Sequence, residues 1–162
     1  MKLVFKNIFI NSPLDKIKRK TDLTIVNGVI KKIGKADSDK NAVEFDFNGI
    51  TCVPGFFDMH VHFREPGQTH KEDMITGMQS AMNGGFTGVM IMPNTNPPID
   101  NGSTIKELLR YNKNSLVDIN ISACVTKNRE GKELNNLSSL KKAGAISFTD
   151  DGSPVYNPNL MR

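Results

Sequence analysis

Short apolar segments alternate with segments of helical periodicity from residue 55 onward, and this alternation constrains the fold more than any other feature of the sequence. Apolar runs predict strands at residues 56–63, 88–92, 117–125 and 145–149. Between the first two lies a run of apolar residues at helical spacing, ended by Gly84-Gly85: Met74, Ile75, Met78, Ala81 and Met82. A second helix is expected from Ser103 through Tyr111, and a third ends at Gly144. This order predicts parallel βαβ units.

The length of the chain limits how far this pattern can run. A closed (β/α)8 barrel needs eight parallel strands and roughly 250 residues, whereas this chain has 162. We therefore expect an α/β fold holding about the first four βα units of a TIM-type barrel, with an open sheet as the alternative. Residues 89–92 are apolar on both faces, which predicts a strand covered on both sides. Residues 158–162 resemble a helix cut in its first turn, which favours the front piece of a longer protein.

The first part of the chain has a different pattern. Residues 3–10, 22–33 and 43–47 are rich in Val, Ile and Phe, and Asn27-Gly28 between two apolar runs predicts a hairpin. We expect a small antiparallel β unit. The predicted boundary assigns residues 1–52 to the N-terminal part of a small β domain and residues 53–162 to the truncated barrel.

Composition excludes several classes of protein. The net charge of +4 is modest, and the basic run at residues 16–20 (KIKRK) holds no aromatic residue, so we expect a solvated loop there and no nucleic-acid binding. No run of about 18 apolar residues is present, so no membrane helix is predicted. We find no secretory signal, and Cys52 and Cys124 have no metal-ligand spacing, which together favour a reducing cytoplasm.

The segment at residues 56–64 (FFDMHVHFR) carries most of the chemistry. Because side chains alternate along a strand, the ionisable residues Asp58, His60, His62 and Arg64 should share one face and the apolar residues the other. In a strand buried on both sides this polar row needs a compensating metal, partner or ligand. The spacing of the two imidazoles suits one divalent ion, and a hydrogen-bonded pair is the alternative.

Two later strand ends add polar groups at the same edge of the sheet. Asn94 follows the second strand in a Pro- and Asn-rich segment, where a simple turn is the alternative interpretation. Asp150 and Asp151 follow the fourth strand, and strand parity alone does not decide which of them reaches the site. His70 lies in a loop, and we interpret it as a structural or surface residue.

Several motifs together resemble those of dihydroorotases, the longer bacterial class I type within the amidohydrolase superfamily: residues 53–67 (VPGFFDMHVHFREPG), 70–72 (HKE), 84–87 (GGFT), 92–95 (MPNT) and 148–152 (FTDDG). The resemblance covers essentially the whole chain as the N-terminal third or so of that family. It implies that His60, His62 and Asp151 are zinc ligands, with Asp151 standing where many relatives have a carbamylated lysine. It also implies that Arg64 and Asn94 hold the substrate carboxylate.

The resemblance further implies a reaction and its setting. The reaction is the zinc-dependent, reversible hydrolysis of (S)-dihydroorotate to N-carbamoyl-L-aspartate in de novo pyrimidine (UMP) biosynthesis, with one or two zinc ions. The general acid–base aspartate of the family, like its two further histidine ligands, is expected outside residues 1–162. We expect a cytoplasmic homo-oligomer, and association with aspartate transcarbamoylase stays open. Residues 1–162 alone should be inactive and poorly soluble, because a parallel sheet edge would be exposed.

Two alternatives keep the fold and change the function. One is a non-catalytic dihydroorotase-like subunit that scaffolds aspartate transcarbamoylase, although the presence of His60, His62 and Asp151 argues against a lost metal site. The other is a hydantoinase- or allantoinase-like hydrolase. Arg64 and Asn94 distinguish the two substrate classes, because only a carboxylated ring needs them.

Overall fold

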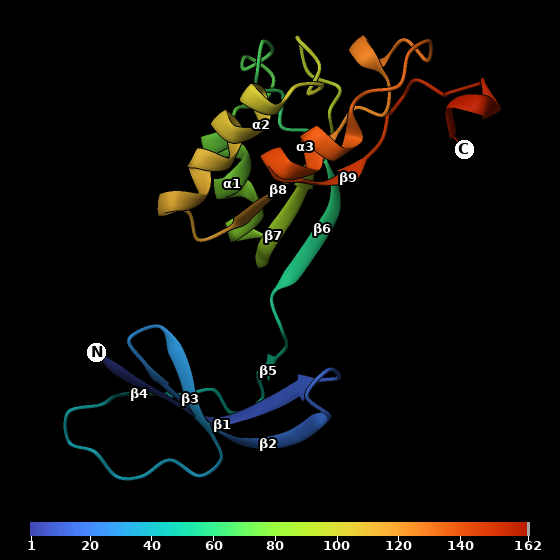
Figure 1. Cartoon of the computed structure of the whole chain (residues 1–162). Coiled ribbons are helices and arrows are strands. Elements are labelled where there is room, and N and C mark those ends of the chain that lie inside the picture. Colours follow the sequence, from blue (N-terminus) through green and yellow to red (C-terminus); the bar gives the residue numbers. More distant parts are fainter. Residues whose placement is uncertain (162) are drawn as a thin grey trace. The chain divides into compact units, whose positions relative to one another are not determined.

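A computed structural model describes residues 1–161 (Figure 1). The chain divides into two compact units, Met1–Pro54 and the part that begins at Gly55. Each unit has its own sheet, and each is described by itself below.

The N-terminal unit is a five-stranded mixed sheet. Its strands are β1 (Lys2–Ser12), β2 (Ile17–Val26), β3 (Val29–Ile33), β4 (Val43–Asp46) and β5 (Thr51–Cys52). The order is β3-β2-β1-β4, with β5 also paired to β1. The strands β1, β2 and β3 are antiparallel, but β4 and β5 both pair parallel with β1. The expectation of a purely antiparallel unit was therefore wrong, because the loop after β3 carries the chain back to the start of β1 before it pairs.

The hairpin signal in this unit is confirmed. Asn27 and Gly28 connect β2 to β3 with φ of 50° and 79°, the left-handed pair that a two-residue hairpin turn requires. The basic run is not a loop, as was expected: residues 17–20 belong to β2, and Lys18, Arg19 and Lys20 are exposed there. A cluster of charged residues does not by itself indicate a loop, because a strand at the surface of a small sheet also tolerates charged side chains that face the solvent. Ile8, Ile10 and Leu23 form the buried core of the unit.

The second unit is a four-stranded parallel sheet, and the predicted βαβ pattern is confirmed. Its strands are β6 (Phe56–Val61), β7 (Phe86–Ile91), β8 (Asp118–Ala123) and β9 (Ala145–Phe148), in spatial order β6-β7-β8-β9. The connections contain α1 (Met74–Asn83), α2 (Gly102–Leu108) with the 3₁₀ helix η1 (Leu109–Asn114), and 3₁₀ helix η2 (Lys127–Arg129) with α3 (Leu137–Ala143). A last 3₁₀ turn, η3, spans Pro158–Met161, and the end of the predicted cut helix, residue 162, lies outside the described residues.

Side-chain caps explain where the helices start and stop. The Asp73 side chain accepts a hydrogen bond from the Thr76 N–H and forms a capping box at α1. The cap of α2 is Asn101, not Ser103 as the sequence suggested, because the Asn101 side chain accepts from the Thr104 N–H. Gly144 ends α3 with φ of 119°, a conformation that favours glycine.

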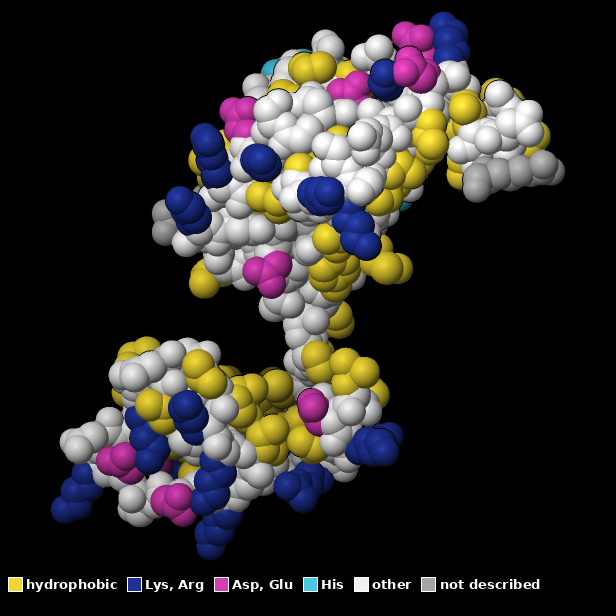
Figure 2. Space-filling view, viewed as in Figure 1, with side chains coloured by type: hydrophobic (Ala, Val, Ile, Leu, Met, Phe, Trp, Pro, Cys, Tyr) yellow, Lys and Arg dark blue, Asp and Glu magenta, His cyan; other side chains and the backbone are white. Residues whose placement is uncertain are grey.

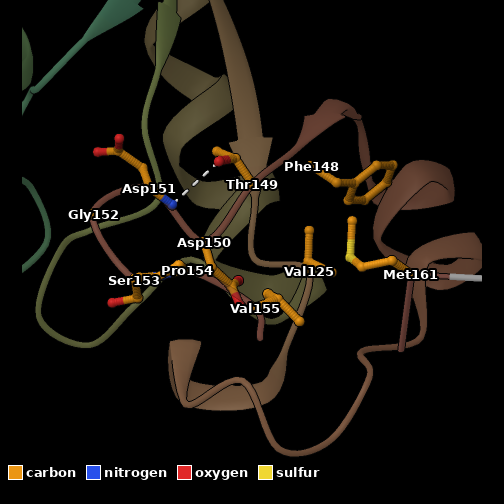
Figure 3. A pocket seen from close by; sticks show the side chains of 10 residues that line it. All are labelled: Val125, Phe148, Thr149, Asp150, Asp151, Gly152, Ser153, Pro154, Val155 and Met161. Carbon is orange, nitrogen blue, oxygen red and sulfur yellow. Dashed lines mark hydrogen bonds between the residues drawn. The ribbon is translucent and has the colours of Figure 1, made fainter. Parts of the chain in front are cut away.

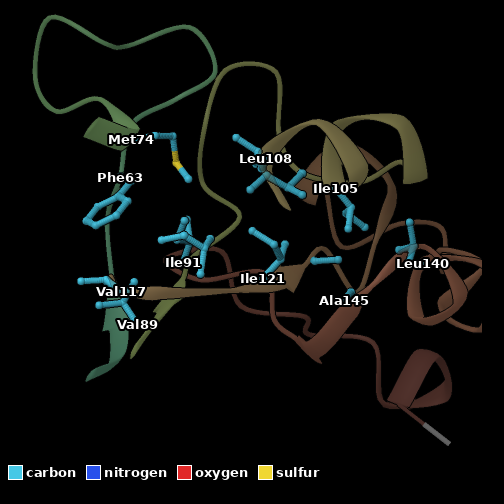
Figure 4. Close-up of a cluster of buried hydrophobic side chains, with 13 residues drawn as sticks. Phe63, Met74, Val89, Ile91, Ile105, Leu108, Val117, Ile121, Leu140 and Ala145 are labelled. Carbon is cyan, nitrogen blue, oxygen red and sulfur yellow. The ribbon is translucent and has the colours of Figure 1, made fainter. Parts of the chain in front are cut away.

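The core of this unit lies between the sheet and the helices (Figure 4). Side chains from β7 and β8, such as Val89, Ile91 and Ile121, meet Met74 of α1 and Leu140 of α3. Helix α1 carries a glycine in its interior because a Cβ on Gly77 would lie 2.4 Å from the ring of Phe63. The helix thereby approaches the sheet closely and fixes the segment that follows β6.

The other face of the sheet is less covered than the sequence suggested. Met90 of β7 is only partly buried, although its neighbours Val89 and Ile91 are almost completely buried. Strand β6 lies at one edge of the sheet, and its Phe57 and Met59 side chains are 47% and 76% exposed. The expectation that these strands are buried on both sides is therefore wrong for residues 1–161, because only the helix-facing side has a partner layer.

Two surface properties bear on the class of protein. Lysine and arginine side chains are scattered over the face shown in Figure 2 and form no continuous patch there. Among residues 1–161, no helix combines the length and apolar character needed to cross a membrane. The absence of nucleic-acid binding stays a prediction.

Candidate metal centre

A bulge in β6 decides which of its side chains face the site. Asp58 pairs with Val89, and Val61 pairs with Ile91. Between these two pairs β6 therefore has one residue more than β7, which is a β-bulge. The bulge shifts the alternation, and Asp58 lines a hollow beside α1 together with Val61 and Phe63. The predicted row of four ionisable residues on one face is therefore broken: Asp58 accepts a hydrogen bond from the His60 N–H at 3.0 Å instead of joining the imidazoles.

The two imidazoles of the predicted pair converge. The Nε2 atoms of His60 and His62 lie 3.2 Å apart, and the rings meet edge to face with centroids 5.0 Å apart. The His60 side chain is 56% exposed and that of His62 is 33% exposed. Both rings therefore stand at the surface of this unit with one nitrogen each directed to a common point.

The structure brings Asp151, and not Asp150, to that point. The Asp151 carboxylate lies 3.5 Å from His60 Nε2 and 3.7 Å from His62 Nε2. The Asp150 carboxylate is buried and accepts hydrogen bonds from the backbone and hydroxyl of Thr126. Figure 3 shows the two carboxyl groups pointing in different directions from consecutive positions, as neighbours on extended backbone do.

The spacing of these groups fits a metal ion. Ligand atoms of His60, His62 and Asp151 all lie within 4.8 Å of one another. A tetrahedral ion with bonds of about 2.0–2.2 Å to nitrogen and oxygen places its ligand atoms roughly 3.3 Å apart. The two Nε2 atoms lie 3.2 Å apart, and each has a different oxygen of Asp151 nearby: Oδ1 is 3.5 Å from His60 Nε2 and Oδ2 is 3.7 Å from His62 Nε2. Two imidazole nitrogens and a carboxylate oxygen are also ligands that first-row divalent ions accept, so the group can hold such an ion.

Asn94 connects two members of this group. It follows β7, and its Oδ1 lies 2.9 Å from His62 Nδ1 while its Nδ2 donates to Asp151 Oδ2 at 2.9 Å. If the carboxamide donates to Asp151, its oxygen accepts from His62, so His62 carries its proton on Nδ1. Nε2 then keeps its lone pair, as a metal-ligating imidazole requires.

Arg64 lies next to Asn94. Its Nη1 donates to the Asn94 carbonyl oxygen at 3.3 Å and approaches the side-chain Oδ1 at 3.4 Å. Among residues 1–161 the hydrogen bonds of this guanidinium all leave from Nη1, which keeps its other N–H groups available to an anion. The structure thus groups Arg64 with the residues predicted for the site.

The loop that carries Arg64 is held from two directions. The neighbouring Glu65 accepts hydrogen bonds from the Met74 N–H at 3.1 Å and the Tyr111 hydroxyl at 2.9 Å, and the bond to this carboxylate raises the pKa of Tyr111. Gly67 lies against the loop after β7, where an added Cβ would be 1.7 Å from the Asn96 carbonyl oxygen. His70, interpreted as a surface residue, is exposed in a turn and is not among the three grouped ligands.

Sequence reasoning missed the residues of the loop after β8. Thr126 and Arg129 hold the backbone and the side chains of the segment that contains Asp150 and Asp151. The only signal available was their place after the third predicted strand, at the same sheet edge as the other site residues. Beyond Asp151, the segment borders an open hollow of about 580 Å³ that Val125, Phe148 and Met161 also line (Figure 3).

Comparison with known proteins identifies the family. A family model described as dihydro-orotase-like matches residues 49–162. The chain belongs to this dihydroorotase-like family. It is 44% identical over its whole length to a protein named dihydroorotase from Aquifex aeolicus, and 43% identical to one from Elusimicrobium minutum. It spans only 39% and 38% of these two relatives.

Solved structures agree on the fold. The L-hydantoinase (dihydropyrimidinase) from Arthrobacter aurescens matches 98% of the chain with a TM-score of 0.73 at 20% identity, and the chain covers 36% of it. A dihydroorotase crystal structure matches 91% of the chain with a TM-score of 0.60 at 13% identity, and the chain covers 41% of it. At these identities the two matches support the α/β architecture of the family.

Proposed function

We propose that the complete protein is a zinc-dependent dihydroorotase that reversibly hydrolyses (S)-dihydroorotate to N-carbamoyl-L-aspartate in de novo pyrimidine (UMP) biosynthesis. The observation that carries the proposal is the convergence of His60, His62 and Asp151 within 4.8 Å beside an arginine, in a chain 44% identical to a protein named dihydroorotase. The chain spans 39% of that relative, so activity is proposed for the complete protein.

His60, His62 and Asp151 are proposed to hold the zinc. When bound there, the ion supplies Lewis acidity that polarises the amide carbonyl of the ring. His62 keeps its Nε2 lone pair when its Nδ1–H donates to Asn94, and Asp151 offers a carboxylate oxygen. Whether one or two ions bind depends on ligands that these three residues do not supply.

Arg64 and Asn94 are proposed to orient the substrate through its carboxylate. A planar guanidinium can bind a carboxylate with two parallel hydrogen bonds, and within the described part of the chain the hydrogen bonds of Arg64 leave from Nη1 alone, so its other donors can do this. Asn94 lies between Arg64 and the proposed ligands, so it is placed to set the distance between the carboxylate and the reacting carbonyl.

The rest of the proposal concerns the longer protein. The open four-stranded sheet is proposed to be the first half of a closed (β/α)8 barrel over residues 53–162, and residues 1–52 to be part of a small β domain. Further metal ligands and the general acid–base carboxylate would come from the sequence that the longer relatives possess. A cytoplasmic homo-oligomer, with or without aspartate transcarbamoylase, remains part of this proposal.

The test compares two arginine variants of the full-length protein. The unaltered enzyme should contain zinc and hydrolyse dihydroorotate, and a chelator should abolish turnover. Arg64→Ala should abolish turnover of dihydroorotate while zinc content is retained, whereas Arg110→Ala, an exposed arginine of the same unit, should change neither. Full activity of Arg64→Ala on dihydroorotate would show that the substrate assignment is wrong.

A hydantoinase-like activity is the second candidate, supported by the similarity to a D-hydantoinase structure at 26% identity and a TM-score of 0.62. The same variants separate the two, because a neutral hydantoin ring has no carboxylate for Arg64 to bind. Turnover of hydantoin that survives Arg64→Ala would favour this candidate. A zinc-loaded protein that turns over neither ring would instead favour the non-catalytic subunit.

A further inference from the structure

The loops after β8 and β9 are tied together by a buried carboxylate. Asp150 is 5% exposed and accepts hydrogen bonds from the Thr126 N–H at 3.0 Å and from the Thr126 hydroxyl. The same hydroxyl oxygen accepts from the Gly131 N–H at 2.9 Å. A carboxylate used in this way is not available to a metal, and its bonds join the two loops at a point adjacent to Asp151.

Arg129 makes a second connection, this time to the backbone of the ligand segment. Its Nη2 donates to the carbonyl oxygen of Asp151, lies 3.5 Å from the carbonyl oxygen of Asp150, and donates to Ser153 Oγ at 3.1 Å. These contacts leave the Asp151 carboxylate itself for the two imidazoles, which it faces at 3.5 and 3.7 Å, and for the Asn94 amide, which donates to it at 2.9 Å.

The backbone of the loop after β8 is strained at the residue that makes this connection. Asn128 and Arg129 have φ of 52° and 59°, a left-handed conformation that asparagine tolerates but that is unfavourable for arginine. The Arg129 Nε is buried and has no hydrogen-bond partner among the described residues. The backbone conformation and the unpaired Nε both destabilise the folded chain. The hydrogen bonds from Arg129 to the segment that contains Asp151 offset part of this cost.

The ligand residue is held from several directions. The Asp151 N–H donates to Thr149 Oγ1 at 3.2 Å, and Asn94 Nδ2 donates to the Asp151 carboxylate at 2.9 Å. The Ser153 N–H closes a turn onto the Asp150 carbonyl oxygen at 2.8 Å, but Gly152, with φ of 76°, leaves the backbone after Asp151 flexible. Arg129 adds a restraint on the Asp151 carbonyl oxygen at this point.

We propose that Arg129 is a positioning residue that fixes the backbone of Asp151, so that its carboxylate faces His60 and His62. The inference rests on the metal centre of the proposed function. It assigns to Arg129 a role that acts through Asp151, without contact to substrate or metal.

The experiment uses Co²⁺ as the probe in the full-length protein, because the visible absorption of Co²⁺ reports the geometry of its ligands. Arg129→Ala should weaken Co²⁺ affinity by about 10–100-fold, the usual effect of removing a residue that orients a ligand, and should alter the absorption spectrum. Arg129→Lys keeps a charged donor and should recover part of the affinity. Lys132→Ala is the matched control, because Lys132 is an exposed cation of the same loop and pairs with Glu130.

The outcomes separate this inference from the proposed function. If the unaltered protein binds no Co²⁺, the metal centre is wrong and the inference with it. If it binds Co²⁺ and Arg129→Ala keeps the same affinity and spectrum, even with a lower melting temperature, Arg129 has only a structural role and the inference is overturned. Should Arg129→Ala fail to fold, Arg129→Lys decides: a spectrum altered relative to Lys132→Ala supports the role, and an identical one overturns it.

Discussion

Replacing Asn94 with alanine should weaken metal binding before any substrate is present. The carboxamide makes two contacts of 2.9 Å, one with His62 Nδ1 and one with Asp151 Oδ2. A hydrogen bond to a charged group contributes about 1.5–3 kcal/mol to stability, and the bond to Asp151 is of this kind. In a site as exposed as this one, water replaces part of each lost bond.

The expected magnitude follows from these two bonds. A loss of about 1.4–2.7 kcal/mol in the free energy of metal binding corresponds to a roughly 10- to 100-fold weaker affinity. Asn96→Ala is the control, because it removes the same type of side chain from an exposed position of the same loop. We expect the Asn96 variant to bind metal like the unaltered protein.

Competition with a chromophoric chelator measures this affinity in the full-length protein, and steady-state kinetics measure KM and kcat in parallel. If Asn94 serves only the substrate carboxylate, KM rises and the metal affinity stays within twofold of the control. That result would refute the reasoning from the 2.9 Å contacts. Loss of metal affinity together with a raised KM would mean that the one side chain serves both the metal ligands and the substrate.

Two further predictions concern packing. Gly67→Ala should lower the melting temperature of the full-length protein and raise KM, because the new Cβ would lie 1.7 Å from the Asn96 carbonyl oxygen. Overpacking and the φ of +89° together should lower the free energy of unfolding by about 2–5 kcal/mol. Gly28→Ala has a similar φ of +79° and nothing within 4 Å, so it should cost only about 1–2 kcal/mol, and equal effects would contradict the clash. Burial raises the pKa of Cys124 to about 12, so at pH 8 to 10 an alkylating reagent should modify Cys124 only after unfolding. Mass spectrometry can map the modified positions, with the partly exposed Cys52 as internal control. Alkylation of Cys124 in the native protein would contradict the prediction that its thiol is buried and protonated.

Local patterns in the sequence predicted the order of elements in the second unit. Apolar runs at period two and helical spacing of apolar residues are short-range properties, so strands β6 to β9 and the helices between them followed from the residues alone. The approach of His60 to His62 agrees with their spacing of two residues, although the same spacing failed for Asp58 and His60, which lie at the bulge. Glycine at helix ends, as at Gly144, is likewise a local requirement.

Long-range contacts decided what these patterns left open. The bulge that removes Asp58 from the row depends on register with β7, about which β6 alone carries no information. Which of the two aspartates faces the imidazoles depends on Thr126, which lies 24 positions before Asp150 and donates hydrogen bonds to the Asp150 carboxylate. The parallel pairing of β4 with β1 likewise depends on the path of the loop that precedes β4. The alternation of apolar residues in β4 does not indicate the direction of its partner strand.

Strand and turn preferences act over a few positions, so the residue types at the carboxyl ends of the strands could be predicted from local patterns. Which of these residues face one another depends on contacts between distant parts of the chain. Side chains 32 to 57 positions apart, such as His62 with Asn94 and Asn94 with Asp151, meet through the register of neighbouring strands. That register is set by packing of the whole unit, and it is the reason that one carboxylate points to the imidazoles and its neighbour to the interior.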